Sequence, residues 1–404
     1  MAITAQMALL ADGTVKSWGG NSFGQLGNGE VGGSNSTPAT VKGLDSVVAI
    51  ASGEEFSLAL LADGTVKAWG KNISGQLGNG VSGENAGSAI PVTVTGLTQV
   101  TAIAAGRTHA MALLADGTVK AWGNNEYGEL GIGTLGGNSI SPVPVTVTGF
   151  GQRRVTAIST NDLHNLALMD DGTVMAWGYD WWGQLGRGGS GYRSIATPGM
   201  VTGLHQVKEI AAGGSFSLAR LSDGTLKAWG ANWNGELGNG NFAFAYTPTT
   251  VTGLGSVVAI KAGGSHSMAL LADGTLKSWG WNENGQFGID VAGGDNYSAI
   301  PLTIVVGQGA SRAAPALTYA KNGTNVTASW SAVPGATGYT LLYADYPWMP
   351  WMTMDDIHGI DMWSQQGISV DLWPGAAFYI AVQARNPYGS SDYSNIQWFV
   401  LDGK

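Results

Sequence analysis

The chain has 404 residues, of which only 12% are charged. Its net charge of −9 and the lack of any cluster among its 19 lysine and arginine residues make nucleic acid a poor candidate partner. It contains no cysteine, which excludes disulfides and thiol chemistry, and no apolar run approaches the ~20 residues of a membrane-spanning helix, so neither nucleic acid nor membrane insertion is expected. The 64 glycines indicate a turn-rich chain, and the 16 tryptophans are sufficient for a large core.

A repeated Trp-Gly pair organises most of the chain. Its tryptophans recur at intervals of about 50 residues, a period that predicts a propeller or solenoid of strand-like units. The six tryptophans are Trp18, Trp69, Trp122, Trp177, Trp229 and Trp279.

Each repeat is expected to contain four short strands. In one repeat they are predicted at residues 100–106, 109–114, 119–122 and 144–148. The Asp116-Gly117 pair between the second and third strands is a two-residue hairpin signal, and a glycine-punctuated loop precedes the fourth strand. Four strands per repeat are typical of one propeller blade.

The repeated pattern Ala-Gly-x-x-His-x-x-Ala-Leu, Asp-Gly-Thr-Val and Trp-Gly-x-Asn-x-x-Gly-Gln-Leu-Gly resembles the regulator of chromosome condensation repeat, of bacterial type, over residues 1–309. The resemblance implies an all-β fold with a β-propeller of six to seven blades, each built from about 52 residues. Functions in that family diverge, and include nucleotide exchange on a small GTPase, chromatin binding and inhibition of β-lactamases. The resemblance therefore implies the fold more strongly than the function.

The strand expected at the start of each repeat occurs five times, although the chain has six Trp-Gly pairs. The small-residue strand that opens a repeat occurs only at 47–53, 100–106, 155–160, 207–213 and 257–263. Two interpretations are open. Either upstream sequence is missing or residues 307–316 fill the place irregularly, or one blade lacks a strand and accepts one from another chain at its unpaired edge.

The repeat ends before a second predicted domain. Residues 310–314 are expected to form a linker, and residues 315–404 resemble a fibronectin type III domain, with Trp330 expected in its core. Alternation with a period of two, broken by turn signals, favours a small β-sandwich there.

The titratable residues favour packing and turn roles. His109, His164 and His266 occupy a repeat position that holds phenylalanine in other copies, at Phe56 and Phe216. The aspartate of each Asp-Gly-Thr turn recurs six times, which indicates turn chemistry rather than an active site. We therefore expect no enzyme, no cofactor and no metal site.

The loops that follow the Trp-Gly pairs are the first candidate binding surface. Equivalent loops of a propeller lie on one face, and Trp and Tyr are enriched at interface hot spots. The candidates in these loops are Tyr179, Trp181, Trp182, Trp233 and Trp281.

A Trp- and Met-rich stretch at 346–363 is the second candidate, because adaptable methionine beside rigid tryptophan suits a contact surface. Its candidate residues are Trp348, Met349, Trp351, Met352 and Trp363. The stretch contacts either an external partner or the propeller of the same chain, and both interpretations are open.

These patterns together favour a non-enzymatic scaffold for protein–protein recognition or assembly. Its partner is a protein of unknown identity or another copy of the chain, and the expected location is extracellular or on a bacterial cell surface. The opening residues lack a signal peptide, so a mature or trimmed chain is expected. The alternatives are a carbohydrate-binding surface protein, and a propeller that exchanges guanine nucleotides or inhibits an enzyme.

Overall fold

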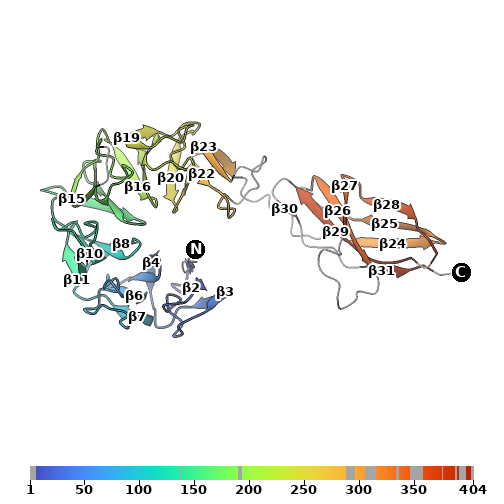
Figure 1. Cartoon of the computed structure of the whole chain (residues 1–404), viewed down its shortest axis with the longest axis horizontal. Helices are drawn as coiled ribbons and strands as arrows, with labels where there is room; N and C mark the ends of the chain where they lie inside the picture. The colour runs from blue at the N-terminus through green and yellow to red at the C-terminus, as the bar shows by residue number, and fades with distance from the viewer. Residues whose placement is uncertain are drawn as a thin grey trace. The chain divides into compact units, whose positions relative to one another are not determined.

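The computed structural model describes residues 6–137, 139–189, 193–287, 296–304, 315–333, 336–345, 358–374, 376–386, 389–390 and 397–401. All regular secondary structure in these residues consists of β-strands (Figure 1). The chain divides into two compact units, which we call the propeller unit (Met1–Glu283 with Asn296–Thr303) and the sandwich unit (Asn284–Asp295 with Ile304–Lys404). The predicted linker at 310–314 lies outside the described residues.

The described part of the propeller unit contains six antiparallel sheets, which we number as blades 1 to 6 along the chain. Blade 1 contains β1 (Gln6–Leu9), β2 (Val15–Gly20) and β3 (Ser34–Thr40). Blade 2 contains β4 (Val47–Ser52), β5 (Phe56–Leu61), β6 (Val66–Gly70) and β7 (Ser88–Thr93). Blade 3 contains β8 (Val100–Ala105), β9 (His109–Leu114), β10 (Val119–Asn124) and β11 (Ile140–Thr146).

The last three blades repeat this order. Blade 4 contains β12 (Val155–Thr160), β13 (His164–Met169), β14 (Val174–Tyr179) and β15 (Ser194–Met200). Blade 5 contains β16 (Val207–Ala212), β17 (Phe216–Leu221), β18 (Leu226–Gly230) and β19 (Ala245–Thr250). Blade 6 contains β20 (Val257–Ala262), β21 (His266–Leu271), β22 (Leu276–Trp281) and β23 (Tyr297–Ile304).

Local chemistry explains why each blade folds this way. The second strand, such as β9, is apolar along most of its length because both its faces are buried between neighbouring blades. The Asp-Gly turn that follows is closed by its own side chain, since Asp116 Oδ1 accepts a 2.8 Å hydrogen bond from the Thr118 N–H. Gly117 adopts a φ of +90°, which glycine tolerates without strain. The predicted strands and turn of this repeat are confirmed, and the fourth strand begins earlier, at Ile140.

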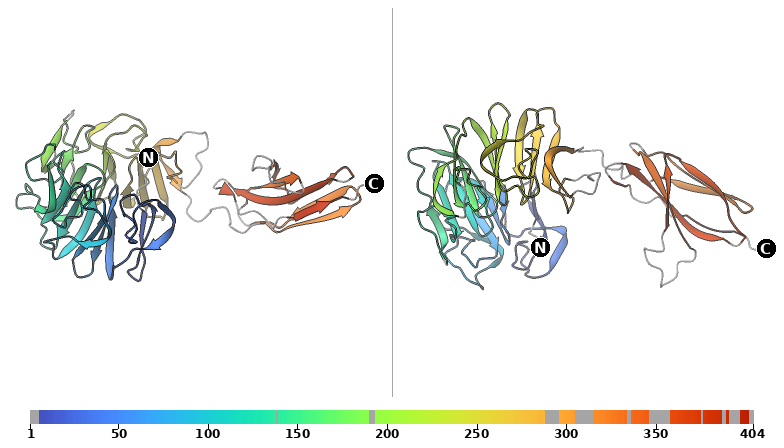
Figure 2. Two further views of the ribbon diagram at one scale, coloured as in Figure 1. Left: turned by 60° about the horizontal axis from the view of Figure 1, so that its bottom comes forward. Right: turned by 45° about the horizontal axis from the view of Figure 1, so that its top comes forward.

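Blade 1 has three strands within the described residues, whereas each of the other five blades has four. Gln6 in β1 pairs with Trp18 just as Ser57 in β5 pairs with Trp69, so β1 is a second strand of its blade. The five innermost strands are therefore β4, β8, β12, β16 and β20, which confirms the count of small-residue strands. Figure 1 shows the six blades following one another in chain order around an arc, and Figure 2 shows the same unit from two further directions.

The sandwich unit contains two sheets. One has the order β24 (Leu317–Asn322), β25 (Asn325–Trp330), β28 (Gly367–Asp371). The other has the order β27 (His358–Trp363), β26 (Gly338–Asp345), β29 (Ala377–Asn386), β30 (Gly389–Ser390), and β31 (Gln397–Val400) also pairs with β29.

One core joins the two sheets of this unit. Trp330 from the first sheet is buried together with Leu341 and Val382 from the second, so the sheets pack face to face as a β-sandwich. The Tyr339 hydroxyl accepts a 2.9 Å hydrogen bond from the Val333 N–H beside this core. The described residues form no helix with the length and apolar character needed to cross a bilayer.

Candidate binding face of the propeller

The turns and loops of one end of each blade form a common surface, which we call the loop face. In blade 5 the first residue of the second strand, Phe216, pairs with Gly230 at the end of the third strand. The turn before Phe216 and the loop after Gly230 therefore emerge at the same end of the blade. The same pairing in blades 2, 3, 4 and 6 places their Trp-Gly loops together on one face, as the repeat predicts.

An asparagine fixes the conformation of the loop in blades 1, 2, 3 and 5. The Asn72 Oδ1 accepts a 2.9 Å hydrogen bond from the Leu77 N–H, and its Nδ2 donates to the Val81 carbonyl. Asn21, Asn125 and Asn232 bind their loops in the same way. In blade 4 this residue is Asp180, whose Oδ1 keeps the first of these hydrogen bonds and whose Oδ2 lies 3.6 Å from Arg193 Nε.

A second side chain fixes the loop position that lies five residues after the repeat tryptophan. Gln184 Oε1 accepts a 3.0 Å hydrogen bond from the Trp182 N–H, and Glu129 Oε2 accepts one of 2.8 Å from the Tyr127 N–H. The side chains of Trp182 and Tyr127 are half-buried. Since each loop backbone is fixed at several points, the aromatic side chains project from rigid supports.

Two aromatic clusters form on this face, and each crosses a boundary between blades. Tyr127 lies edge-on to Tyr179 with ring centroids 5.0 Å apart, and Tyr179 stacks on Trp181 at 5.6 Å, across blades 3 and 4. Trp182 lies edge-on to Trp233 at 4.8 Å, across blades 4 and 5.

Two phenylalanines extend this arrangement. Phe244 completes the second cluster, with its ring centroid 5.6 Å from Trp182 and 5.0 Å from Trp233. Phe242 contacts Tyr297 across blades 5 and 6 at 5.4 Å. Trp181 is 40% exposed and Trp233 is 50% exposed, so each cluster presents one indole to solvent.

The structure thus brings four of the five predicted loop residues into clusters. Trp281 ends β22 half-buried and lies in neither cluster. Trp348, Met349, Trp351 and Met352 lie outside the described residues. Trp363 ends β27 and pairs with Tyr339, and its side chain is outside the described part.

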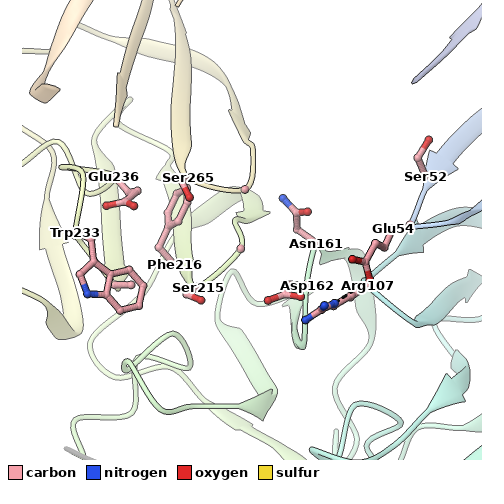
Figure 3. Close-up of a pocket in the computed structure, with 14 residues that line it drawn as sticks. Ser52, Glu54, Arg107, Asn161, Asp162, Ser215, Phe216, Trp233, Glu236 and Ser265 are labelled. Carbon is pink, nitrogen blue, oxygen red and sulfur yellow. Dashed lines mark hydrogen bonds and ion pairs between the residues drawn. The ribbon is translucent and has the colours of Figure 1, made fainter. Parts of the chain in front are cut away.

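A cavity of about 430 Å³ opens among the turns between first and second strands, beside the second cluster (Figure 3). Five equivalent turn residues line it, one from each of blades 2 to 6. They are Glu54, Arg107, Asp162, Gly214 and Gly264. Trp233 and Glu236, from the loop of blade 5, line it as well. The sequence does not predict this cavity, although an alignment of the repeats shows the five turn positions.

The ionisable side chains of this cavity differ in their surroundings: two form an ion pair, and two are carboxyl groups whose pKa is raised by burial. Arg107 Nε lies 2.9 Å from Glu54 Oε2. Burial raises the pKa of Asp162 to about 6, against the opposing attraction of Arg107. Burial also raises the pKa of Glu236, whose carboxylate accepts hydrogen bonds from Asn234.

The repeat histidines pack inside the propeller. His109 Nε2 lies 2.7 Å from Asn165 Oδ1, and His164 Nε2 lies 2.9 Å from Ser217 Oγ. Burial lowers the pKa of His109 to about 4 and that of His164 to about 3, so both are neutral at pH 7. No group of three or more His, Asp or Glu side chains in the described part of the chain is arranged to hold a metal ion.

The repeated four-stranded blades define the chain as a β-propeller protein. It belongs to the RCC1-like domain family, whose profile matches residues 4–325. Among curated relatives, the ultraviolet-B receptor UVR8 of Arabidopsis thaliana is 32% identical over 235 residues, which cover 56% of this chain and 51% of UVR8. The human E3 ubiquitin-protein ligase HERC2 is 33% identical over 238 residues, which cover 56% of this chain and 5% of HERC2.

Solved structures support the same fold. Human WBSCR16 is 26% identical with a TM-score of 0.67, covering 76% of this chain and 81% of that one. Yeast RCC1 (Prp20), in its complex with Kap60, is 25% identical with a TM-score of 0.63, covering 76% of this chain and 74% of that one. The match to curated relatives spans about half of UVR8 and a small part of HERC2, so it shows the propeller family and no whole-protein activity.

Proposed function

We propose that this protein is a non-enzymatic scaffold that recognises a protein partner through the aromatic clusters of its loop face. The cluster of Trp182, Trp233 and Phe244 carries the proposal, because it presents a half-exposed indole from loops whose backbones are already fixed. Rigid aromatic side chains lose little conformational entropy on binding and are the residues most often found at interface hot spots.

The relatives are consistent with this role. One solved structure holds yeast RCC1 bound to Kap60, and another concerns the binding of Prp20p to Gsp1p and histones. Those interactions belong to those proteins. We extend to this chain only the use of an RCC1-like propeller as a protein-binding platform, and its partner is a protein of unknown identity.

The test is affinity enrichment on immobilised full-length protein, followed by a direct binding measurement with the purified partner. We expect the Trp181→Ala/Trp233→Ala double variant to bind that partner roughly tenfold or more weakly than the wild type, since hot-spot truncation typically loses 2 kcal/mol or more, as an order of magnitude. The matched control is Trp373→Ala, which removes a 60% exposed tryptophan from the sandwich unit.

Equal loss in both variants, or no loss in either, would contradict a role for the loop face. Binding of a neutral oligosaccharide that the double variant abolishes would instead support the carbohydrate-binding alternative, in which the exposed indoles stack on sugar rings.

The inner edge of β1 is a second contact surface that we include in the proposal, because no strand within the described residues pairs with it. A strand added at an unpaired edge forms main-chain hydrogen bonds, and it would come from a partner or from another copy of the chain. Light scattering on a size-exclusion column tests self-assembly. A dimer or polymer supports strand exchange between copies, and a monomer of 41.6 kDa at every concentration argues against it.

We also propose an extracellular or cell-surface location, of the kind found in bacterial proteins that combine such repeats with a fibronectin type III-like sandwich. Support comes from the low charge content and the absence of cysteine. The UVR8 and HERC2 relatives are from a plant and a mammal, so the bacterial assignment rests on the resemblance of the sequence pattern. Protease treatment of intact cells tests this location, and a protein that is degraded only after lysis would contradict it.

A further inference from the structure

Two of the five equivalent turns that line the cavity on the loop face carry no side chain. Glu54, Arg107 and Asp162 occupy the turn position in blades 2 to 4, whereas glycine occupies it in blades 5 and 6. A Cβ added at Gly264 would meet no atom within 4 Å. Gly264 therefore leaves open space in the cavity, and Trp233 lies on the side of the cavity away from Arg107 in Figure 3.

The charges around this space favour a cation. Three carboxyl groups and one guanidinium line the cavity, which gives a formal balance of −3 + 1 = −2 when all are ionised. The single guanidinium, Arg107, is already paired with Glu54 at 2.9 Å. Asp162 and Glu236 are carboxylates partly removed from water, and an added positive charge would stabilise their ionised forms.

Trp233 supplies the complementary apolar wall. Its indole is half-exposed, and it contacts both Trp182 and Phe244, which hold the ring in place. A cation over an indole face is attracted by the ring quadrupole, and the methylene stem of a lysine or arginine also buries apolar area against the ring. A negatively charged group would instead be repelled by the carboxylates of Asp162 and Glu236.

We propose that this cavity is the anchoring site for a lysine or arginine side chain of the protein partner, whose stem packs on Trp233 and whose charge lies toward Asp162 and Glu236. This inference rests on the proposed function, because it specifies the chemistry of the partner that the loop face binds. It makes the partner a protein with a projecting basic residue, flanked by apolar residues that contact the aromatic clusters.

Blocked tripeptides test the site without knowledge of the partner. The probes are N-acetyl-Gly-Arg-Gly-amide, its lysine analogue and its glutamate analogue, titrated into the full-length protein and followed by ligand-observed NMR. We expect roughly millimolar affinity for the two basic peptides, which is reasonable for one side chain in one cavity, and at least about tenfold weaker binding of the glutamate peptide. Added salt should weaken the basic peptides selectively.

Substitutions in the cavity can be compared with the same substitution at an equivalent position of another blade. Asp162→Asn and Glu236→Gln should each weaken the arginine peptide by roughly fivefold to tenfold, because each removes a charged acceptor. Glu129→Gln is the matched control, since it makes the same change at the equivalent loop position of blade 3, outside the cavity, and it should leave binding unchanged. Gly264→Met should block the cavity without strain, because the glycine has open space beside it.

Equal binding of the arginine and glutamate peptides would overturn the proposal, as would full affinity in Asp162→Asn/Glu236→Gln and in Gly264→Met. Stronger binding of a neutral oligosaccharide than of either basic peptide would also overturn it. Thermal melting of each variant confirms that it is folded. If the purified partner loses affinity for Trp181→Ala/Trp233→Ala but not for Asp162→Asn/Glu236→Gln, the proposed function stands and the cationic anchor is wrong.

Discussion

The indole N–H of Trp229 donates a 2.9 Å hydrogen bond to the backbone carbonyl of Gln184, which lies in the loop of the preceding blade. The Ser217 hydroxyl donates to the same carbonyl at 2.9 Å. Four other junctions repeat the indole contact, from Trp69 to Gln25, Trp122 to Gln76, Trp177 to Glu129 and Trp279 to Glu236. In blades 2 to 6, the tryptophan that marks the repeat is therefore the residue that fastens its blade to the loop before it.

We expect Trp229→Phe to lower the free energy of unfolding by about 2–4 kcal/mol. The change removes buried volume from a fully enclosed site and one of the two donors of the Gln184 carbonyl. Urea denaturation measures the loss. The control is Trp233→Phe at an exposed position, where a change of no more than about 0.5 kcal/mol is expected. Similar losses in the two variants would show that the indole contact does not fasten the blades.

A second prediction replaces the His109–Asn165 pair between blades 3 and 4 with the phenylalanine and serine that the chain has at the equivalent positions of blades 5 and 6. His109→Phe leaves the buried Asn165 Oδ1 without its 2.7 Å partner, and should reduce stability by about 1–3 kcal/mol. Phe216 and Ser267 occupy the equivalent positions two blades later, where Ser267 Oγ donates to the Glu236 carbonyl at 2.9 Å.

We therefore expect the double variant His109→Phe/Asn165→Ser to recover at least about half of that loss, because the new serine can donate to the Glu129 carbonyl. Urea denaturation of both single variants and the double variant gives the coupling free energy between the two positions. Additive losses would mean that the two side chains do not act as a pair.

The blade architecture could be predicted because its determinants are local and recur. The Asp116 turn, the apolar second strand and the repeat tryptophan each carry a signal within a few residues, and six copies of the repeat reinforce it. The five copies of the small-residue strand could be counted for the same reason. β11 begins at Ile140, earlier than the sequence predicts, because its first residues follow a variable loop that has no repeat pattern.

The binding face could be predicted only in part. The sequence identifies Trp182 as a loop residue, but its contact with Phe244 depends on how the loops of blades 4 and 5 meet across a blade boundary. Phe242 and Tyr297 were missed for that reason. The cavity was missed because Arg107 and Asp162 are far apart in sequence and differ in type, and only the arrangement of blades brings their turns together.

A third prediction concerns pH. Glu129 occupies a loop position that holds glutamine in blades 1, 2, 4 and 6, and burial raises the pKa of its carboxyl to about 7. Its Oε2 accepts the Tyr127 N–H, while its buried Oε1 has no hydrogen-bond partner within the described part of the chain.

Between the unfolded value of 4.5 and the folded value of about 7, the folded carboxyl retains a proton that the unfolded chain has released. The contribution of Glu129 to stability is therefore fully present below pH 4.5 and is lost as the pH rises to about 7. The loss amounts to roughly 3 kcal/mol at most, from 1.36 kcal/mol per pKa unit.

We expect Glu129→Gln to stabilise the protein by about 1–3 kcal/mol at pH 8 and to have little effect at pH 4, as measured by urea denaturation at both pH values. The reverse change, Gln184→Glu, should introduce the same fall in stability with rising pH into blade 4. If Glu129→Gln changed stability equally at both pH values, the carboxyl would not be titrating in the folded protein.

A last prediction compares two glycines at the same turn position of neighbouring blades. A Cβ at Gly214 would lie 2.5 Å from the Gly264 backbone oxygen, whose 3.0 Å hydrogen bond from the Gly214 N–H links the two turns. Because backbone cannot yield as a side chain can, Gly214→Ala should destabilise the protein by about 1–3 kcal/mol.

Gly264→Ala should be neutral or stabilising by about 0.4–1 kcal/mol, because the added methyl meets no atom and the unfolded chain loses conformational freedom. Thermal melting of the two variants side by side gives the difference. Equal melting temperatures would show that the two turns are not held in contact, and the cavity that they border would then lack one of its walls.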